Sequence, residues 1–220
     1  NILRYMQFHQ TIIEKVAEKK RYEILESLPV YGPMYIPVTE NGEPYYSEGF
    51  AVRFYKTDGT NWVANFKPGW TGLNKVFDFP EHDKTIIIAG GLGYIMTPEN
   101  EKPLSTFGIT INEIFQANNG SLVCADGIYV FVFDNLSGDI WRSDRISWDG
   151  FQNLKFKNNI ISGQSYEPSI SMEGWTDFSL NIETKELIGG SYKELTVVNP
   201  YVQNIVLQNE SKSKSWWKIW

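Results

Sequence analysis

The sequence predicts an all-β protein, mainly antiparallel, preceded by one N-terminal helix. Residues 45–192 form a series of short apolar or alternating runs, and turn residues separate these runs about every 8–12 positions, as in antiparallel β domains. Aromatic residues make up 15% of the chain, and aromatic side chains favour strands. Sustained helical periodicity occurs in one stretch, before residue 30. These three observations define the expected fold class.

The helix is expected over residues 1 to about 28. Apolar side chains recur there at three- and four-residue spacings, and charged residues fill the opposite face. No Gly or Pro interrupts the stretch before Pro29, which cannot continue a helix. We expect this first unit, residues 1–30, to pack on the body of the protein. The apolar positions are Ile2, Met6, Ile13, Val16, Ala17, Ile24 and Leu25.

Residues 31–205 are expected to form one β-rich domain of tandem hairpins. Four segments share a strand–turn–strand pattern, and their turn centres recur at close to the ~40–45 residue period of a four-stranded propeller blade. We therefore predict a propeller-like arrangement. Four repeats are few for a closed ring, so an open ring or a twisted β-sandwich is the alternative. The turn centres are Gly59, Asn100, Gly138 and Thr184.

The third and fourth hairpins resemble blades of known propellers. In "DGIYVFVFDNLSGDIWRS", residues 126–143, an apolar strand leads through D-x-x-[ST]-G into a strand with Trp. This is similar to the outer hairpins of quinoprotein and WD-type propellers. "FSLNIETKELIGGS", residues 178–191, is similar too, although Asn181 and Lys185 stand where the pattern has Asp and Gly. The resemblance implies a fold, and it implies neither an activity nor a cofactor.

A second, looser resemblance concerns function. The phrases "WRSDRISWDG" at 141–150 and "GGSY" at 189–192 look like those of uncharacterised small acidic bacterial proteins. Some small acidic β-rich proteins of this kind act as immunity partners of toxins. The resemblance implies a protein partner.

Overall charge and hydropathy narrow the class of partner. The net charge is −6, whereas nucleic-acid binding needs a concentrated basic face, so we expect no nucleic-acid partner. No apolar run reaches the ~18 residues of a transmembrane helix. We expect a cytoplasmic protein without a transmembrane segment.

Residue patterns typical of catalysis or metal binding are missing from the sequence. The aspartates of residues 134–150 fail as a calcium loop, because Leu136 and Ile146 occupy ligand positions. Cys124, the single cysteine, alternates with apolar neighbours and predicts a buried, unreactive thiol. His9 and His82 are the two histidines, and no Gly-x-Ser-x-Gly motif accompanies them. We expect no catalytic residue, no metal site and no cofactor.

The abundance of aspartate and aromatic residues leaves one alternative open. Asp134, Asp139, Asp144 and Asp149 could supply the two carboxylates of a glycosidase, and aromatic rings suit stacking against sugars. The alternative function is therefore a carbohydrate-active enzyme or a sugar-binding module.

The leading prediction is a non-catalytic protein-binding module, and its most concrete version is a toxin-neutralising immunity protein. Four residues of the 134–150 stretch fall beyond the predicted hairpin, on an expected loop. Tryptophans elsewhere could anchor an interface, three of them in a Lys- and Trp-rich tail over residues 206–220. That tail is expected to dock on the body or a partner, or to touch a membrane surface. The proposed binding residues are Asp144, Arg145, Trp148, Asp149, Trp70, Trp216, Trp217 and Trp220.

Overall fold

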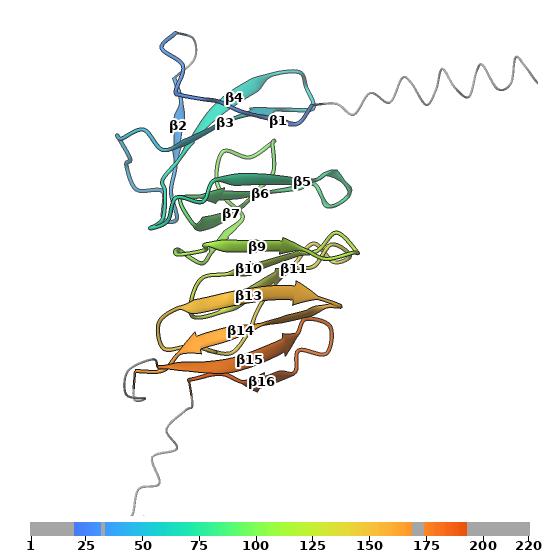
Figure 1. Ribbon diagram of the computed structural model, residues 1–220. Helices are drawn as coiled ribbons and strands as arrows, with labels where there is room; N and C mark the ends of the chain where they lie inside the picture. Colours follow the sequence, from blue (N-terminus) through green and yellow to red (C-terminus); the bar gives the residue numbers. More distant parts are fainter. Residues whose placement is uncertain (1–19, 32–33, 169–173, 193–220) are drawn as a thin grey trace, which may run out of the picture.

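The all-β prediction is confirmed. The structure is a computed structural model, and it describes residues 20–31, 34–168 and 174–192. These residues contain sixteen strands and a single short 3-10 turn, η1 (Pro80–His82) (Figure 1). None of the helical structure in this part of the chain has the length and apolar character needed to cross a membrane.

The strands form four sheets of four strands each, whereas a β-sandwich has two sheets. The last three sheets are simple antiparallel meanders, and in the first sheet β2 lies parallel to β4. The first sheet has the order β1 (Tyr22–Ile24), β3 (Phe50–Tyr55), β4 (Asn61–Phe66), β2 (Ile36–Val38). The second is β5 (Lys75–Phe79), β6 (Lys84–Ala89), β7 (Leu92–Met96), β8 (Ser105–Phe107). The third is β9 (Glu113–Gln116), β10 (Leu122–Ala125), β11 (Val130–Phe133), β12 (Ile140–Arg142). The fourth is β13 (Phe151–Lys157), β14 (Ile160–Tyr166), β15 (Trp175–Asn181), β16 (Leu187–Gly189).

Each turn centre inferred from the sequence lies between two paired strands of a different sheet. Gly59 joins β3 to β4, Asn100 joins β7 to β8, and the turns at Gly138 and Thr184 do the same in the third and fourth sheets. In the third sheet Oδ1 of Asp134 accepts the N–H groups of Leu136 and Ser137, at 2.7 and 3.0 Å. The aspartate thus closes the hairpin turn.

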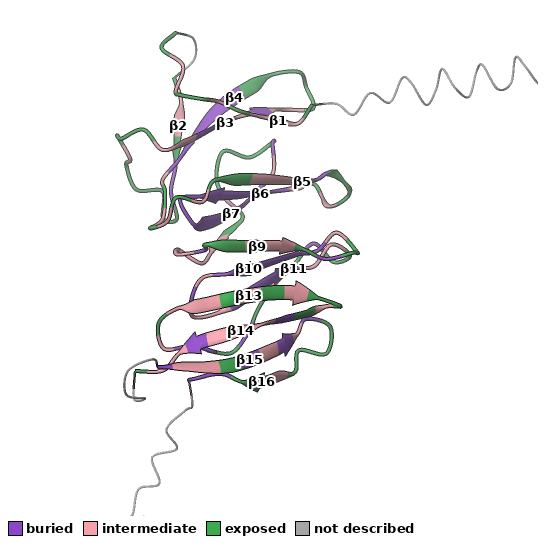
Figure 2. Ribbon diagram, in the orientation of Figure 1, coloured by how far each residue is buried: buried purple, intermediate pink, exposed green. Residues whose placement is uncertain are grey.

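The sheets are stacked face to face from the first to the fourth (Figure 1), and the central strands of the inner two, β6, β7, β10 and β11, are almost wholly buried (Figure 2). Strand β6 shows why: Ile87 belongs to the apolar cluster shared with the first sheet, while Ile86 and Ile88 belong to the cluster shared with the third. A third cluster joins the third and fourth sheets, with Val132 and Phe178 among its members. Within the described residues no apolar cluster joins the first sheet to the fourth.

The outer face of the fourth sheet carries a row of hydrogen-bonded polar side chains, and the exposed Ile160 and Ile188 lie on the same face. Nε2 of Gln152 donates to Oε1 of Gln164 at 2.9 Å, and Nε2 of Gln164 donates to Oδ1 of Asp177 at 3.0 Å. These three side chains form a row across β13, β14 and β15. A polar row on the outer face suits a sheet at the end of a stack, because no further sheet has to cover it.

Polar side chains also stand on the outward face of the first sheet, next to Ala51 and Val63. Nη1 of Arg53 and the hydroxyl of Tyr55 both donate to Oε2 of Glu23, each at 2.8 Å. Arg53 and Tyr55 alternate along β3 with the buried Val52 and Phe54. The two ends of the stack are therefore finished by hydrogen-bonded polar side chains.

Three linkers connect the sheets, at residues 67–74, 108–112 and 143–150, and all lie at one end of the stack, here called the linker end. They bond to one another and to the central hairpins: Trp70 N–H donates to Ile109 O at 3.0 Å, and Ile146 N–H to Ile128 O at 3.0 Å. A Cβ on Gly69 would lie 2.2 Å from Ile109 O, so this approach requires glycine. The opposite end, which carries the four hairpin turns named above, is called the hairpin end.

The N-terminal helix prediction is wrong for residues 20–28. That part of the chain contains β1, whose Tyr22, Glu23 and Ile24 pair with β3. Tyr22 packs against the first apolar cluster while Glu23 takes part in the outer polar group, so the alternation of a strand outweighs the helical spacing here. Residues 1–19, where the rest of the helix was expected, lie outside the described residues.

Phe133→Ala should destabilise the fold strongly. The ring is buried and packs 4.3 Å from that of Phe79 across the second and third sheets, so its removal leaves a cavity costing about 3–5 kcal/mol. The matched control is Leu136→Ala, at a side chain that is 80% exposed and should change stability by less than about 0.5 kcal/mol. Urea denaturation measures both. Equal effects of the two changes would show that this ring does not hold the sheets together.

Candidate functional site

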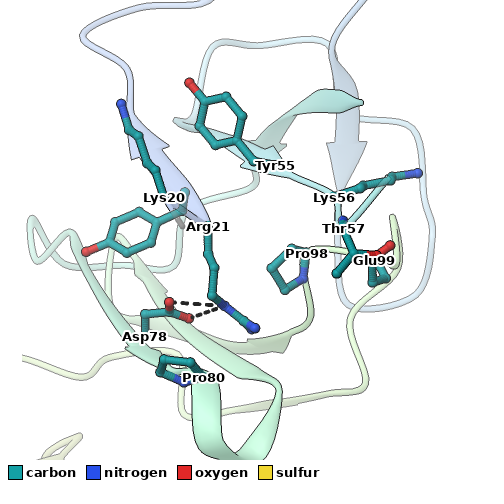
Figure 3. Close-up of a pocket in the computed structure, with 10 residues that line it drawn as sticks. Lys20, Arg21, Tyr55, Lys56, Thr57, Asp78, Pro80, Pro98 and Glu99 are labelled. Atoms are coloured by element: carbon teal, nitrogen blue, oxygen red, sulfur yellow. Dashed lines mark hydrogen bonds and ion pairs between the residues drawn. The ribbon is translucent and has the colours of Figure 1, made fainter. Parts of the chain in front are cut away.

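Two cavities of similar size lie at opposite ends of the stack. At the hairpin end a cavity of about 650 Å³ lies between the first and second sheets. Figure 3 shows that side chains of β1, the β3–β4 turn, β5 and the β7–β8 turn line it, with Lys20, Arg21 and Lys56 among them. Three cations around one cavity make it the first place to test for a ligand.

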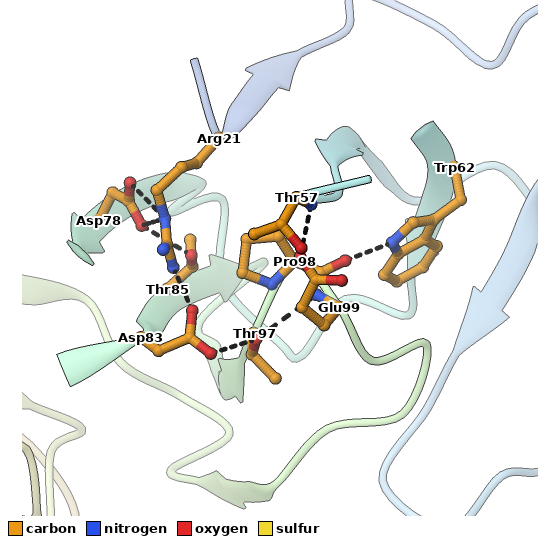
Figure 4. Close-up of polar contacts among 9 residues, drawn as sticks. All are labelled: Arg21, Thr57, Trp62, Asp78, Asp83, Thr85, Thr97, Pro98 and Glu99. Atoms are coloured by element: carbon orange, nitrogen blue, oxygen red, sulfur yellow. Dashed lines mark hydrogen bonds and ion pairs between the residues drawn. The ribbon is translucent and has the colours of Figure 1, made fainter. Parts of the chain in front are cut away.

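The central cation of this cavity is already paired. Nε of Arg21 lies 3.1 Å from Oδ2 of Asp78, and Nη2 lies 3.0 Å from Oδ1 of Asp83. Each carboxylate is held in turn by a threonine: Thr85 donates to Asp78 at 2.8 Å and Thr97 donates to Asp83 at 3.1 Å. Figure 4 shows these contacts as one connected group. Arg21 therefore ties β1 to the second sheet.

The remaining polar contacts of the cavity also join the two sheets. Thr57 N–H donates to Oε1 of Glu99 at 2.7 Å, and Nε1 of Trp62 donates to Pro98 O at 2.9 Å (Figure 4). Beside them Glu23 accepts hydrogen bonds from Lys20 and Tyr55, which lower the pKa of its carboxyl to about 2. The cations that line this cavity pair with carboxylates of the protein, which is the pattern of a structural contact between the two sheets.

At the linker end a cavity of about 570 Å³ lies between the third and fourth sheets. The end of β12 and the third linker supply most of its wall, and Leu187 and Tyr192 close it from the fourth-sheet side. Two arginines and one aspartate stand in its lining: Arg142, Asp144 and Arg145.

Arg145 is fixed in position by the chain around it. Its Nε donates to Ser147 O at 3.0 Å and its Nη2 to Trp148 O at 2.9 Å. The guanidinium carbon lies 5.3 Å from the centre of the Trp148 ring and 4.5 Å from that of Tyr192. The two rings are themselves 4.9 Å apart. Arg145 thus organises an aromatic corner, and its position is preformed.

Arg142 differs from Arg145 and from Arg21. Its guanidinium carbon lies 4.6 Å from the centre of the Tyr129 ring, which supports it from one side. Among the described residues the guanidinium of Arg142 makes no hydrogen bond and no ion pair. The exposed carboxylate of Asp144 makes none either. Since a guanidinium carries five N–H donors, Arg142 presents its donors to the solvent side of the cavity.

A smaller cavity, of about 440 Å³, adjoins this one and shares Tyr129 and Arg142 with it. It lies between the second and third sheets, and its other lining residues are largely apolar. Asp126 stands at its edge and accepts the N–H groups of Ile128 and Tyr129 at 2.9 and 2.7 Å. Burial raises the pKa of Asp126 despite these hydrogen bonds. The apolar members of the lining are Phe107, Ile109, Ile128, Phe131 and Ile140.

The structure brings several of the proposed binding residues together. Asp144 and Arg145 line the linker-end cavity, Trp148 packs on Arg145, and Asp149 is exposed on the same linker. Trp70 is 79% exposed on the first linker, where its backbone N–H donates to the carbonyl oxygen of the lining residue Ile109. Trp216, Trp217 and Trp220 lie outside the described residues.

Sequence reasoning missed three residues of this site: Tyr129, Arg142 and Tyr192. The first two flank the third hairpin, at positions that fit ordinary strand residues. The pairing of the two strands of this hairpin places Arg142 opposite Phe131, so Arg142 and Phe131 lie on one face of the sheet. This pairing is the feature of the sequence from which the position of Arg142 could have been inferred. Tyr192 reaches Arg145 through the fold alone, from more than forty positions along the chain.

Two further observations limit the chemistry. Among the described residues no group of three or more His, Cys, Asp or Glu side chains is placed to hold a metal ion. Cys124 is buried, and burial raises the pKa of its thiol to about 12, so the thiolate is strongly disfavoured near neutral pH.

Comparison with known proteins leaves the function to be argued from the residues. No protein-family model matches the chain, and a search of curated proteins finds no match.

Asp126→Asn should stabilise the protein increasingly as the pH rises through the carboxyl range. Burial raises the pKa of the folded-state carboxyl above its ordinary value of 3.8, so the folded state binds more protons than the unfolded state there. Stability of the parent protein therefore falls as the pH rises through this window. The asparagine does not titrate, and its Oδ1 can still accept both N–H groups.

Urea denaturation of parent and variant at about pH 3 and about pH 7 measures this difference. The gain from Asp126→Asn should be larger at the higher pH. An equal or smaller gain there would contradict the raised pKa.

Proposed function

We propose that this chain is a non-catalytic protein-binding module and that its partner docks on the linker end. The observation that carries the proposal is the concentration of arginine and aromatic side chains around one cavity. Tyr129, Arg142, Arg145 and Tyr192 line it. Arg142 lies over the Tyr129 ring, and Arg145 lies against the rings of Trp148 and Tyr192. Trp, Tyr and Arg are the residue types enriched in the energetic centres of protein interfaces.

The state of these side chains before binding supports the same proposal. Arg145 is held by two backbone carbonyl groups and two rings, so little conformational entropy is lost when a partner covers it. Arg142 keeps its donors available, and Trp70 offers a large exposed ring on the first linker. A partner would thus meet a preformed surface with one uncommitted cation.

The most concrete version of this function is a toxin-neutralising immunity protein. Its support is the sequence resemblance and the small acidic format, with a net charge of −6 over 220 residues. In this version the captured partner is an enzyme, and binding at the linker end blocks its activity.

The double variant Trp70→Ala, Arg142→Ala should lose the partner. Truncation of a central interface residue costs about 2 kcal/mol or more, which is about thirtyfold in affinity. The full chain is immobilised, incubated with extract of its source, and the captured proteins are quantified by mass spectrometry. Recovery of the partner should fall to background with this variant.

The control variant is Leu136→Ala, Lys155→Ala, which removes one exposed apolar and one exposed cationic side chain away from the linker end. It should retain the partner. Capture of no protein that separates the two variants would sink the proposal. The immunity version requires, in addition, that the recovered partner is an enzyme inhibited by the parent protein and released by the linker-end variant.

We also infer a propeller-like arrangement, in which each sheet acts as a blade of an open ring. Support comes from the four consecutive four-stranded sheets and from the linkers at a common end. In addition, each sheet has a hairpin turn between its third and fourth strands in chain order. The polar outer faces of the first and fourth sheets favour an open arrangement over a closed one.

A sugar-binding module is the second candidate, and the outer face of the fourth sheet favours it. Hydrogen bonds hold the side chains of Gln152, Gln164 and Asp177 in a row. The orientations of their amide and carboxylate groups, and hence of their hydrogen-bond donors and acceptors, are therefore fixed. Tyr166 and Trp175 stand beside the row, with ring centres 5.5 Å apart. Fixed amides next to aromatic rings suit the hydroxyl groups and apolar faces of sugars.

Gln164→Leu should abolish sugar binding if this face is the site. The change keeps the approximate size of the side chain and removes the amide at the centre of the row, which costs about 1 kcal/mol or more per lost hydrogen bond. An array of neutral glycans identifies a ligand, and titration calorimetry compares the variants. Lys157→Ala serves as the control, because Lys157 lies on the same face of the sheet but outside the row. A parent protein that binds no glycan would exclude this candidate.

A further inference from the structure

We infer that the partner recognised at the linker end presents an acidic group next to a large apolar side chain. This inference rests on the proposed protein-binding function and specifies the chemistry that the site reads. Two adjoining cavities that share one wall carry it.

The acidic group is read by Arg142. Three arginines of the described chain can be compared: Arg21 and Arg53 are paired with carboxylates, at 3.1 and 2.8 Å. The Arg142 guanidinium lies over the Tyr129 ring and in the electrostatic field of Asp126, and among the described residues no carboxylate forms an ion pair with it. An arginine held flat on a ring keeps its N–H fork free for a planar carboxylate, which it binds through two parallel hydrogen bonds.

The two cavities together are lined by two guanidinium groups, those of Arg142 and Arg145, and by two carboxyl groups, those of Asp126 and Asp144. The larger cavity is lined by two guanidinium groups and one carboxylate, that of Asp144. In the smaller cavity, burial raises the pKa of the Asp126 carboxyl, and the positive charge of Arg142 acts in the opposite direction. Neither carboxyl group forms a hydrogen bond or an ion pair with the Arg142 side chain, so its N–H donors remain available to an anionic group of a partner.

The apolar side chain is accepted by the smaller cavity. Its volume is about 440 Å³, and Phe107, Ile109 and Phe131 supply apolar wall between the second and third sheets. Burial of a large apolar side chain in such a site is the usual source of affinity at the centre of an interface.

The spacing of the two groups follows from the shared wall. Tyr129 and Arg142 line both cavities, so a residue in the smaller one and a carboxylate on Arg142 belong to neighbouring positions of the partner. The site therefore reads a pair of side chains, one apolar and one acidic, that lie side by side on the partner surface or along one segment of its chain.

The test uses the full chain and a phage-displayed library of random short peptides. The parent protein should enrich peptides that carry Asp or Glu within a few positions of a large apolar residue. Fluorescence polarisation with the enriched peptide then compares three proteins: the parent, Arg142→Gln, and the control Lys155→Gln. Both substitutions remove one exposed positive charge.

We expect Arg142→Gln to weaken binding about tenfold or more, as the loss of a charge-assisted pair does, and Lys155→Gln to leave it unchanged. Arg142→Glu should restore binding when the acidic residue of the peptide is replaced by lysine. This exchange of charges has no effect if Arg142 merely supports the fold.

Enrichment of basic peptides, of no peptides, or of peptides that bind Arg142→Gln as tightly as the parent overturns the inference. The proposed function has its own readout, the capture of a partner that Trp70→Ala, Arg142→Ala loses. Capture without an acidic–apolar preference rejects the inference and keeps the function, whereas failure of capture rejects the function.

Discussion

Face-to-face packing of consecutive sheets is the interaction on which the rest of this structure depends. Ile86, Ile87 and Ile88 of β6 point alternately to the third and the first sheet, so one short strand contributes to two apolar clusters. Such a strand needs apolar residues on both faces, which explains why residues 86–89 of β6 and all of β11 are continuous apolar runs and not alternating ones. The linkers, the hairpin turns and the three cavities between neighbouring sheets take their positions from this packing.

The sequence was most informative where local chemistry decides the structure. Gly138 and Asp134 mark a hairpin turn through backbone preference and hydrogen bonding within a few residues, so the turn could be found by inspection. The stretch around Tyr22 could not, because its apolar spacing fits a helix and only pairing with β3 makes it a strand. Non-local pairing decides such cases, and a single sequence does not contain it.

The candidate site follows the same division. Asp144, Arg145 and Trp148 were found because they stand close together beyond a predictable hairpin. Tyr192 completes the stack on Arg145 from a distant part of the chain, and this contact exists because the fourth sheet returns to the linker end. The difference between the two ends also depends on contacts between distant parts of the chain. Arg21 at the hairpin end is paired with carboxylates of the neighbouring sheet, whereas Arg142 at the linker end forms no ion pair with a described residue.

The one-dimensional order of the sheets has a consequence for how the molecule opens. Each inner sheet is held by two neighbours, but the first and fourth sheets are each held by one. In arrays of this type stability is approximately a sum of contributions from individual units and their nearest-neighbour contacts. Partial opening should therefore begin at the terminal sheets and leave the central pair intact. Arg142 and the smaller cavity belong to that central pair, whereas Leu187 and Tyr192 of the larger cavity lie on the side of the fourth sheet. The part of the proposed docking surface around Arg142 should therefore be the last to lose its shape.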